Sequence, residues 1–507
     1  MTLRLRTTLR RLAANTAVPA ALFLSAGTLV AQNAPVTLTL GSDKDAKPVS
    51  PLFAGLSMET EKILPEPDGS HYFSPKNAAL VSTFKQLGLR HLRIGGNTVD
   101  DDLTPPSEAD IDELFAFAKA AGVKVSYSVR LKNNADPKES ARIAKYIHDR
   151  YPDLSAGITI GNEVNNFFRG KDGLKNYLAT VKTHIDAMRA AAPGLIVNGP
   201  GVCVDAAGRR SGYSIAGEAG WLLKFNEAFH DTVKIGYIGS HAYFGGAAYN
   251  RTGKAVLEWN PAELRAEMLS PAWIGKYERM YQSFGPELAK TGTPYRVDET
   301  NTYYIGGAKG ASNSMAAAVW SLDYLYWWAS HGAQGINFHN GTTLPFSKGS
   351  LPDGATRKPC YYASFWGVPG GYSVQAVGYG IKAFDLGGHG SLLPVTLSSP
   401  EKTNITAYAT RADDGGVYLT VINKEIGTAA RRVLIAQPKD SRFGRAESMS
   451  LEVKNHDAAA TEGFTLGGAA ISHDGAWEGK WIPASTDGEA ITLLVPNTSA
   501  VVLHLSR

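Results

Sequence analysis

The chain has 507 residues, of which 44% are hydrophobic and 19% charged, with 51 Lys and Arg against 47 Asp and Glu. This composition is ordinary for a soluble globular protein, and the length allows a barrel of about 250–300 residues plus a second domain. The net charge of +4 is small, and no long basic block follows the N-terminus, so nucleic-acid binding is not expected.

Residues 1–34 have the pattern of an export signal. Several arginines precede an apolar stretch at residues 17–30, and the small residues Ala31 and Ala34 follow it. A membrane anchor or an amphipathic helix is the alternative, but the stretch is shorter than the roughly 20 apolar residues of a membrane span. We therefore expect cleavage near Ala31 or Ala34 and a periplasmic or secreted protein without a membrane segment.

Residues 50–385 alternate between short apolar runs and longer helix-like segments. The expected strands are residues 52–56, 91–94, 123–129, 158–160, 195–197, 235–238, 295–297 and 335–338. The expected helices are residues 76–87, 107–121, 137–151, 177–192, 221–229, 273–290 and 314–330, with a last helix between residues 361 and 384. Eight strand–helix units in this order predict a parallel sheet closed into a (β/α)8 TIM barrel, with a doubly wound open sheet as the alternative.

The pattern changes at residues 386–507. Short runs rich in β-branched residues are separated by turn residues, at 406–410, 416–422, 448–453, 491–495 and 500–505. This predicts a second domain that is an antiparallel β-sandwich. In the preceding segment 35–49, Val36–Leu40 alternates apolar and polar residues, and we expect it to join that sandwich as a further strand.

Two glutamates follow expected barrel strands. Gly161-Asn162-Glu163 comes after the fourth strand, and Asp298-Glu299-Thr300-Asn301 comes after the seventh. Active-site groups of such barrels lie where the strands end, and a retaining glycosidase needs two carboxyl groups about 5–5.5 Å apart. Glu163 is the candidate acid/base and Glu299 the candidate nucleophile. Taken singly, either motif is weak, because Glu163 could merely start a helix and Glu299 could form a surface salt bridge.

Further polar residues near strand ends are candidates for binding a sugar. Asn162 is placed to hydrogen-bond the sugar 2-OH, and an ionised Glu299 needs donors, for which we consider Arg93, Tyr243 and Asn301. Glu59, Asn97, His241 and Tyr243 are the other candidate substrate contacts. The aromatic residues at positions 320, 324, 327 and 328 have helical spacing, which favours a buried core over a sugar platform.

The two cysteines, Cys203 and Cys360, are far apart in the sequence. An exported protein could pair them, and two buried thiols are equally compatible with the sequence. Neither lies in a CxxC motif or a Cys/His cluster, so no metal site is expected.

With these motifs and the expected sandwich, the chain resembles glycoside hydrolase clan A, and within it family 79, which holds β-glucuronidases and heparanases. The paired glutamates mark only the clan. The more specific segments are Arg93-Ile94-Gly95-Gly96-Asn97, Phe338-His339-Asn340-Gly341 and Tyr361-Tyr362-Ala363, the last taken as the start of the final helix.

The resemblance implies a retaining double displacement by Glu163 and Glu299 without a metal or organic cofactor. It also implies that tyrosine hydroxyl and backbone N–H groups after strands seven and eight bind a uronate carboxylate, and Tyr304, Asn340 and Gly341 are the nearest matches. The sequence departs from the family pattern just after Gly341, where residues 342–345 offer no tyrosine.

The leading hypothesis is therefore an exported exo-β-glucuronidase that releases terminal β-linked glucuronic acid from glycans or glycoconjugates. One alternative is a retaining clan A glycosidase for another sugar, such as a neutral pyranoside or an arabinofuranoside, or an endo-acting heparanase-like enzyme. An alternative of another class is a carbohydrate-binding protein without catalysis.

Overall fold

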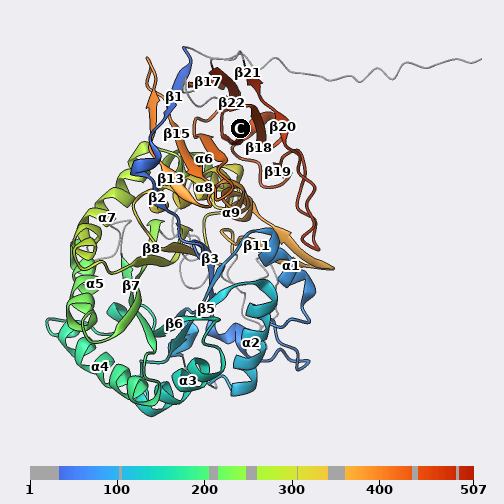
Figure 1. The fold of residues 1–507 in the computed structure, drawn as a ribbon. Helices are drawn as coiled ribbons and strands as arrows, with labels where there is room; N and C mark the ends of the chain where they lie inside the picture. Colours follow the sequence, from blue (N-terminus) through green and yellow to red (C-terminus); the bar gives the residue numbers. More distant parts are fainter. Residues whose placement is uncertain are drawn as a thin grey trace, which may run out of the picture.

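The computed structural model describes residues 34–101, 105–204, 215–246, 260–304, 306–340, 360–436, 443–486 and 490–506. The expected export signal, apart from Ala34, and the candidate Gly341 lie outside these ranges. Within them, no helix combines the length and the apolar character that crossing a bilayer requires. Figure 1 shows a barrel with a smaller β-rich unit above it.

Eight parallel strands close into a barrel in the order β10-β3-β4-β5-β6-β7-β8-β9. Their bounds are β3 (Ala54–Glu59), β4 (His91–Gly95), β5 (Lys124–Val129), β6 (Ser155–Ile160), β7 (Ile196–Val204), β8 (Lys234–Gly245), β9 (Tyr295–Tyr303) and β10 (Gly335–His339). The barrel prediction is confirmed, and the open-sheet alternative is wrong because β10 pairs with β3.

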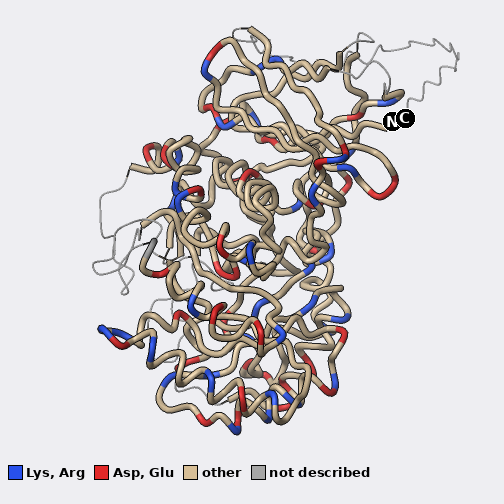
Figure 2. The backbone as a smooth tube through the Cα atoms, turned by 60° about the vertical axis from the view of Figure 1, so that its left-hand side comes forward, with Lys and Arg blue, Asp and Glu red and all other residues tan. Residues whose placement is uncertain are grey.

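Helices surround the barrel (Figure 1). They are α1 (Ala78–Gln86), α2 (Glu108–Ala121), α3 (Pro137–Arg150), α4 (Gly173–Ala191), α5 (Ile215–Phe229), α6 (Pro261–Met268), α7 (Pro271–Thr291), α8 (Met315–Ser330) and α9 (Ala376–Gly387). Local signals fix several ends: Ser107 and Asp110 form a capping box at the start of α2, and Gly122 ends it in a left-handed conformation. Figure 2 shows acidic and basic residues interspersed along the outer helices.

The last barrel segment differs from the expectation. Residues 361–363 do not begin a helix, because an antiparallel hairpin of β11 (Phe365–Val368) and β12 (Gly371–Val374) follows them. Gly370 and Gly371 have positive φ at the tip of this hairpin, which explains why the chain turns there. Helix α9 begins only at Ala376.

Two sheets form the upper unit, in the orders β14-β1-β17-β22-β21 and β19-β18-β23-β16-β15-β13-β2, with β20 paired to β18. The bounds are β1 (Val36–Leu40), β2 (Lys47–Pro48), β13 (Ser391–Leu393), β14 (Val395–Ser398), β15 (Ile405–Arg411), β16 (Val417–Asn423), β17 (Ala430–Ala436), β18 (Arg445–Glu452), β19 (Thr465–Leu466), β20 (Ile482–Pro483), β21 (Ser485–Thr486), β22 (Ala490–Pro496) and β23 (Ser499–Ser506). Apolar side chains from both sheets, including Val36, Val433 and Leu503, form a core of their own.

Strand β1 ties the beginning of the described chain to the sandwich. It pairs antiparallel with β14 and parallel with β17, and the chain then enters the barrel at β3. Helix α8 lies between barrel and sandwich, and every side chain from Met315 to Ala329 is buried. Its aromatic residues therefore belong to the core.

Candidate active site

A β-bulge places two acidic side chains of β9 inside the barrel. Ser240 of β8 pairs with Val297, but the next residue, His241, pairs with Glu299, so Asp298 is an extra residue. The pairing with β10 shifts in the same interval. Successive side chains of a regular strand point to opposite faces, whereas a bulge re-aims them, and here Asp298 and Glu299 are both buried.

The sequence-based placement of Glu299 needs one correction. Strand β9 does not end before this residue but continues to Tyr303, so Glu299 lies inside the strand. The polar residues from Asp298 to Asn301 are tolerated because they point into a polar barrel interior or bond to backbone groups. Asn301, a candidate donor to Glu299, instead donates to the carbonyl groups of His339 and Tyr362.

Glu163 lies just beyond β6 in a left-handed conformation with φ of 46°. Such a conformation is uncommon for a residue other than glycine, and it persists here because the Glu163 N–H donates to the carbonyl of Gly201 at 2.9 Å. A 3-10 turn follows, but the Glu163 side chain makes no capping hydrogen bond to it. Its carboxylate instead accepts a hydrogen bond from Asn166 Nδ2 at 2.6 Å.

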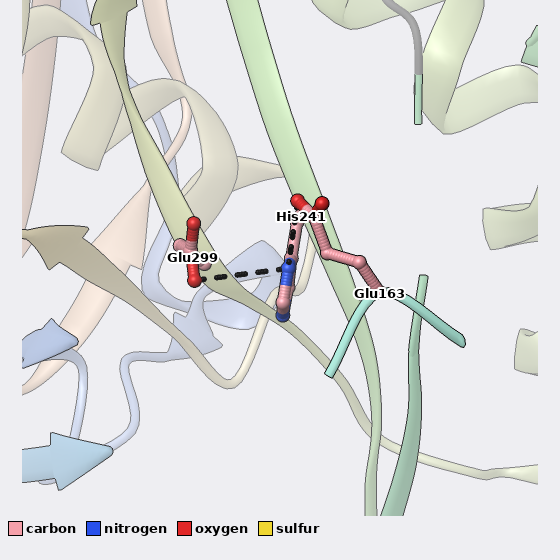
Figure 3. A group of neighbouring side chains, drawn as sticks. All are labelled: Glu163, His241 and Glu299. Carbon is pink, nitrogen blue, oxygen red and sulfur yellow. Dashed lines mark hydrogen bonds and ion pairs between the residues drawn. The ribbon is translucent and has the colours of Figure 1, made fainter. Parts of the chain in front are cut away.

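The two glutamates approach each other across the imidazole of His241 (Figure 3). His241 Nδ1 lies 3.4 Å from Glu163 Oε1 and 3.7 Å from Glu299 Oε2. One oxygen of each carboxylate and one imidazole nitrogen all lie within 4.8 Å of one another. Glu163 and Glu299 are 136 residues apart in the sequence, and the structure brings them together with His241.

Two buried donors hold the carboxylate of Glu299. Arg93 Nη1 donates to Oε2 at 2.7 Å, and the Tyr243 hydroxyl donates to Oε1 at 2.9 Å. Arg93 is fully buried at the inner face of β4 and also donates to Ser57 and to Asn162 Oδ1. Of the three donors that the sequence suggested for Glu299, Arg93 and Tyr243 are thus in contact with it, whereas Asn301 is not.

This environment favours the ionised form of Glu299. Burial alone would raise the pKa of its carboxyl, but His339, His241 and Arg93, together with the Tyr243 hydrogen bond, outweigh burial and lower that pKa. Burial and the Glu299 charge raise the pKa of Tyr243 well above its ordinary value, so its hydroxyl stays a donor. Glu299 has the properties of a carboxylate nucleophile.

A third carboxyl group, Glu59, lies at the end of β3. It accepts hydrogen bonds from the Thr98 N–H at 2.9 Å and hydroxyl at 2.8 Å, and His339 Nε2 lies 3.8 Å away. Burial is the main reason that its pKa is raised. Asn97 precedes Thr98 in the sequence and accepts a hydrogen bond from Asn162 at 3.3 Å.

The glycines at positions 95 and 96 make room for side chains. A Cβ on Gly95 would lie 2.7 Å from the Arg93 guanidinium carbon, and one on Gly96 would lie 2.3 Å from the Glu59 carboxylate. Glycines at such a position can let a ligand approach the backbone. Instead they let two charged side chains lie against the strand end.

The residues expected to bind a uronate carboxylate are placed differently from one another. The Tyr304 ring lies 6.3 Å from that of Tyr243, at the edge of the site. Asn340 is fully buried, and its amide bonds to the backbone of Ser364 and Phe365. The side chain of Asn340 therefore anchors the residue that follows β10 to the backbone of Ser364 and Phe365.

The structure adds several residues that were not predicted. Ser57 and Glu59 lie two apart on β3, and that alternation was the available signal for Ser57. Asp100 joins three loops by accepting hydrogen bonds from the backbone N–H groups of Asn162, Leu131 and Lys132. Nothing in the sequence distinguishes Asp100 from the exposed Asp101 next to it.

The arrangement of donors also bears on metal binding. The carboxylates and the imidazole could ligate a cation, but the guanidinium of Arg93 lies 2.7 Å from Glu299 Oε2 and places a positive charge beside that position. This positive charge opposes the binding of a cation at Glu299. Cys203 and Cys360, which both lie in the described part of the chain, do not form a disulfide with each other.

Comparisons with known proteins relate this architecture to glycoside hydrolases. No protein-family model matches the chain. A β-glucuronidase from Aspergillus niger is 26% identical over 232 residues, covering 42% of this chain and 42% of that protein, so the chain matches about two fifths of its relative's length.

Two solved structures of similar fold are those of a 4-O-α-L-rhamnosyl-β-D-glucuronidase from Fusarium oxysporum 12S and a family 51 arabinofuranosidase from Xanthomonas axonopodis pv. citri. The first has a TM-score of 0.65 and 18% identity over 92% of this chain and 99% of that one. The second has a TM-score of 0.63 and 14% identity over 94% and 100%. The chain thus has the barrel fold of known glycoside hydrolases.

Proposed function

We propose that this protein is a retaining exo-β-glucuronidase of the family 79 type, with Glu163 as acid/base and Glu299 as nucleophile. The observation that carries the proposal is the approach of one oxygen from each carboxylate to within 4.8 Å. Retaining glycosidases have carboxyl groups about 5–5.5 Å apart, whereas inverting enzymes need about 6.5–9.5 Å to admit a water molecule.

In the first step, Glu299 attacks the anomeric carbon while protonated Glu163 gives its proton to the leaving oxygen. Arg93 and Tyr243 orient Glu299 through one hydrogen bond to each of its oxygens. Asn162 Oδ1 is fixed by Arg93, which leaves the Asn162 amide N–H groups for Asn97 and the sugar 2-OH.

In the second step, Glu163 is a carboxylate and removes a proton from water, whose oxygen attacks the anomeric carbon. The bond between that carbon and Glu299 breaks, Glu299 leaves as a carboxylate, and the sugar is released with its original anomeric configuration. Glu163 regains its proton, so the enzyme returns to its starting state.

The choice of a β-glucuronide is supported by the partial match to the Aspergillus niger β-glucuronidase and by the resemblance of the fold to the Fusarium enzyme. We place the uronate carboxylate near Tyr304 and Gly341, while the buried Asn340 supports the chain beside them. Glu59, Asn97, His241 and Tyr243 line the rest of the proposed sugar site.

The test is hydrolysis of 4-nitrophenyl β-D-glucuronide beside the β-D-glucoside, β-D-galactoside, β-D-xyloside and α-L-arabinofuranoside. We expect glucuronide turnover, with NMR detection of a β-configured first product. Glu163→Gln and Glu299→Gln should each lower kcat/KM by several orders of magnitude, since the amide can neither give a proton nor act as a nucleophile. Near-normal turnover by either variant would contradict the mechanism.

A matched control is Glu287→Gln, because this side chain is exposed on α7 and pairs with the exposed Lys290 of the same helix. Activity on a neutral sugar or an arabinofuranoside alone would keep the two glutamates and discard the uronate site. Binding of glucuronides without hydrolysis of any substrate would favour a carbohydrate-binding protein.

We also propose that the enzyme is exported. The basic and then apolar character of residues 1–34 supports this proposal. Expression with the native N-terminus and mass analysis of the mature protein should place cleavage near Ala31 or Ala34, and an intact N-terminus would contradict export.

A further inference from the structure

Asp298 is a buried carboxyl group whose neighbours do not satisfy it by ordinary hydrogen bonds. It is fully buried, and among the described residues neither of its oxygens has a hydrogen-bond partner. The Nε2 of His241, also buried and lacking a partner within the same ranges, lies 3.7 Å from Asp298 Oδ1. Two buried polar groups without partners, facing each other, indicate an interaction between them.

Arg93 and Arg296 are the other cationic groups near this pair. Arg93 donates to Ser57, Asn162 and Glu299, and Arg296 donates to Asn337 and to backbone carbonyls, while the Nε of each has no hydrogen-bond partner among the described residues. The hydroxyl of the nearby Tyr237 donates to Ser126. Within the described ranges, His241 is the cationic group that lies at ion-pair distance from Asp298, at 3.7 Å.

The opposite nitrogen of the same imidazole faces the catalytic carboxylates. His241 Nδ1 lies 3.4 Å from Glu163 and 3.7 Å from Glu299, so the ring stands between Asp298 and both of them. Protonation on both nitrogens satisfies Nε2 toward Asp298 and Nδ1 toward the glutamates. A neutral ring satisfies only one side.

We propose that Asp298 is a positioning residue, which acts through His241 to keep an imidazolium against Glu163 and Glu299. The bulge in β9 serves this purpose, because it turns the extra residue into the barrel beneath the histidine. The inference rests on the proposed function, in which the negative charge passes from Glu299 to Glu163 and back during one turnover.

The benefit of one shared cation follows from the charges in the two steps. Before attack, the negative charge is on Glu299 and the proton is on Glu163. In the glycosyl-enzyme, Glu299 is an uncharged ester and Glu163 carries the negative charge. An imidazolium nitrogen at nearly equal distance from both carboxylates stabilises the charged member in each step without moving.

The electrostatics agree with this geometry. Burial lowers the pKa of His241, but the charges of Glu299 and Asp298 and the hydrogen bond with Glu163 outweigh burial and the opposing charge of Arg93, so the pKa is raised. Burial raises the pKa of Asp298, while His241 and Arg93 oppose that rise. A raised pKa extends the pH range in which the imidazolium is present, and the cation is lost as the pH rises through that pKa.

The direct test is NMR titration of the histidine nitrogens in ¹⁵N-histidine-labelled protein, with the His241 signal assigned by its loss in His241→Gln. We expect His241 to be doubly protonated at neutral pH. Asp298→Asn should lower its pKa by about 1–3 units, the usual effect of removing an adjacent opposite charge. An unchanged titration would overturn the proposal. This measurement needs no substrate, so it is independent of whether any glycoside is hydrolysed.

Kinetics then test the effect on catalysis. Asp298→Asn should lower kcat/KM, and the alkaline limb of its pH profile should lie at lower pH than in the wild type, because the imidazolium is lost earlier. In a His241→Gln background, Asp298→Asn should have no further effect. Equal losses in both backgrounds, or an unshifted alkaline limb, would overturn the role in catalysis.

The matched control is Asp385→Asn on α9, because Asp385 also pairs with a histidine, His389 at 3.1 Å, but lies outside the site. It should leave the pH profile unchanged. If Asp298→Asn does not fold, Asp298→Ser removes the same charge with a smaller side chain and should give the same shift.

Discussion

At the scale of single residues, the site depends on the guanidinium of Arg93. One buried side chain joins Ser57 on β3, Asn162 after β6 and Glu299 on β9, and so connects three segments of the barrel. A guanidinium has five donors in a planar fork, whereas an ammonium group is a compact charge on a flexible chain. A positive charge alone is therefore insufficient to bind Ser57, Asn162 and Glu299 at the same time.

We expect Arg93→Lys to keep the positive charge but lower kcat/KM by about 100-fold or more, since donors aimed at a reacting group contribute about 10²–10³ each. Steady-state kinetics on an aryl glycoside measure this. Arg142→Lys, at a half-exposed site on α3 where the arginine pairs with Glu108 and Glu139, is the matched control and should have no effect. Wild-type kinetics for Arg93→Lys would show that charge suffices.

The hydroxyl of Tyr243 leads to a prediction about pH. The pKa of Glu299 is lowered in the folded protein, so the nucleophile stays ionised, and activity is lost only as the pH falls through that low value. Tyr243→Phe removes one donor to the carboxylate and should raise this pKa. The acidic limb of kcat/KM should therefore move to higher pH. Tyr146→Phe, which removes a hydroxyl bonded to Asp112 on the surface, should leave the limb in place.

At the scale of elements, the sequence predicted the order of strands and helices because each unit carries its own signals. Apolar runs, caps such as Ser107 and stops such as Gly122 act locally, and they fix element identity without the rest of the chain. The bulge at Asp298 has no such signal. It exists because strands on both sides of β9 set its register, and those partners lie far away in the sequence.

The same distinction applies to the candidate site. Glu163, Glu299, Arg93 and Tyr243 could be found because polar residues after apolar runs point to barrel strand ends. The hydrogen bonds of Asn340 and Asn301 to the backbone could not, since an amide suits a ligand and a carbonyl equally well. The residue type determines which hydrogen bonds a side chain can make, but it does not determine which group becomes its partner.

The loop after β4 offers a test at this scale. Gly96 has φ of 71° and no room for a Cβ beside Glu59, whereas Gly122 has φ of 75° and open space around it. Gly122 has ψ of 35° and is left-handed, where alanine costs about 1–2 kcal/mol of unfolding free energy. Gly96 has ψ of −171°, a combination that is essentially limited to glycine. Gly96→Ala should therefore lose more stability than Gly122→Ala, and it should also lose activity because Glu59 must move.

Urea denaturation and kinetics on both glycine variants separate strain from crowding. Gly122→Ala is the control for alanine at a positive φ in open space, and it should retain full kcat/KM. Equal stability losses and full activity in both variants would contradict the crowding that the structure indicates at Gly96.

At the scale of the whole molecule, the barrel and the sandwich share helix α8. Its Tyr326 hydroxyl lies 2.9 Å from Thr420 Oγ1, and its ring stacks on that of Tyr408. Asp323 of the same helix pairs with Lys424 of the sandwich at 2.8 Å, and both side chains are buried. Since β1 also belongs to the sandwich, the described chain begins there, passes through the barrel and returns.

This shared helix predicts that barrel and sandwich unfold together. Without the sandwich, α8 would expose apolar side chains and the charge of Asp323, so the barrel loses part of its packing when the sandwich unfolds. Thermal unfolding followed by circular dichroism and by tryptophan fluorescence should therefore give one coincident transition. Two separate transitions would show that the contact between the units is weak.

The Asp323–Lys424 pair is the point at which this coupling can be weakened. Asp323→Ala leaves the Lys424 ammonium buried without its partner, which typically costs about 3–5 kcal/mol, and should lower the Tm of the single transition. The double variant Asp323→Leu with Lys424→Met should recover most of the loss, because it removes the unpaired charge and fills the space. Asp186→Ala, which breaks an exposed pair with Lys182, should change the free energy of unfolding by less than about 1 kcal/mol. If Asp323→Ala and Asp186→Ala are equally mild, the buried pair does not couple the two units, and the apolar contacts of α8 alone hold them together.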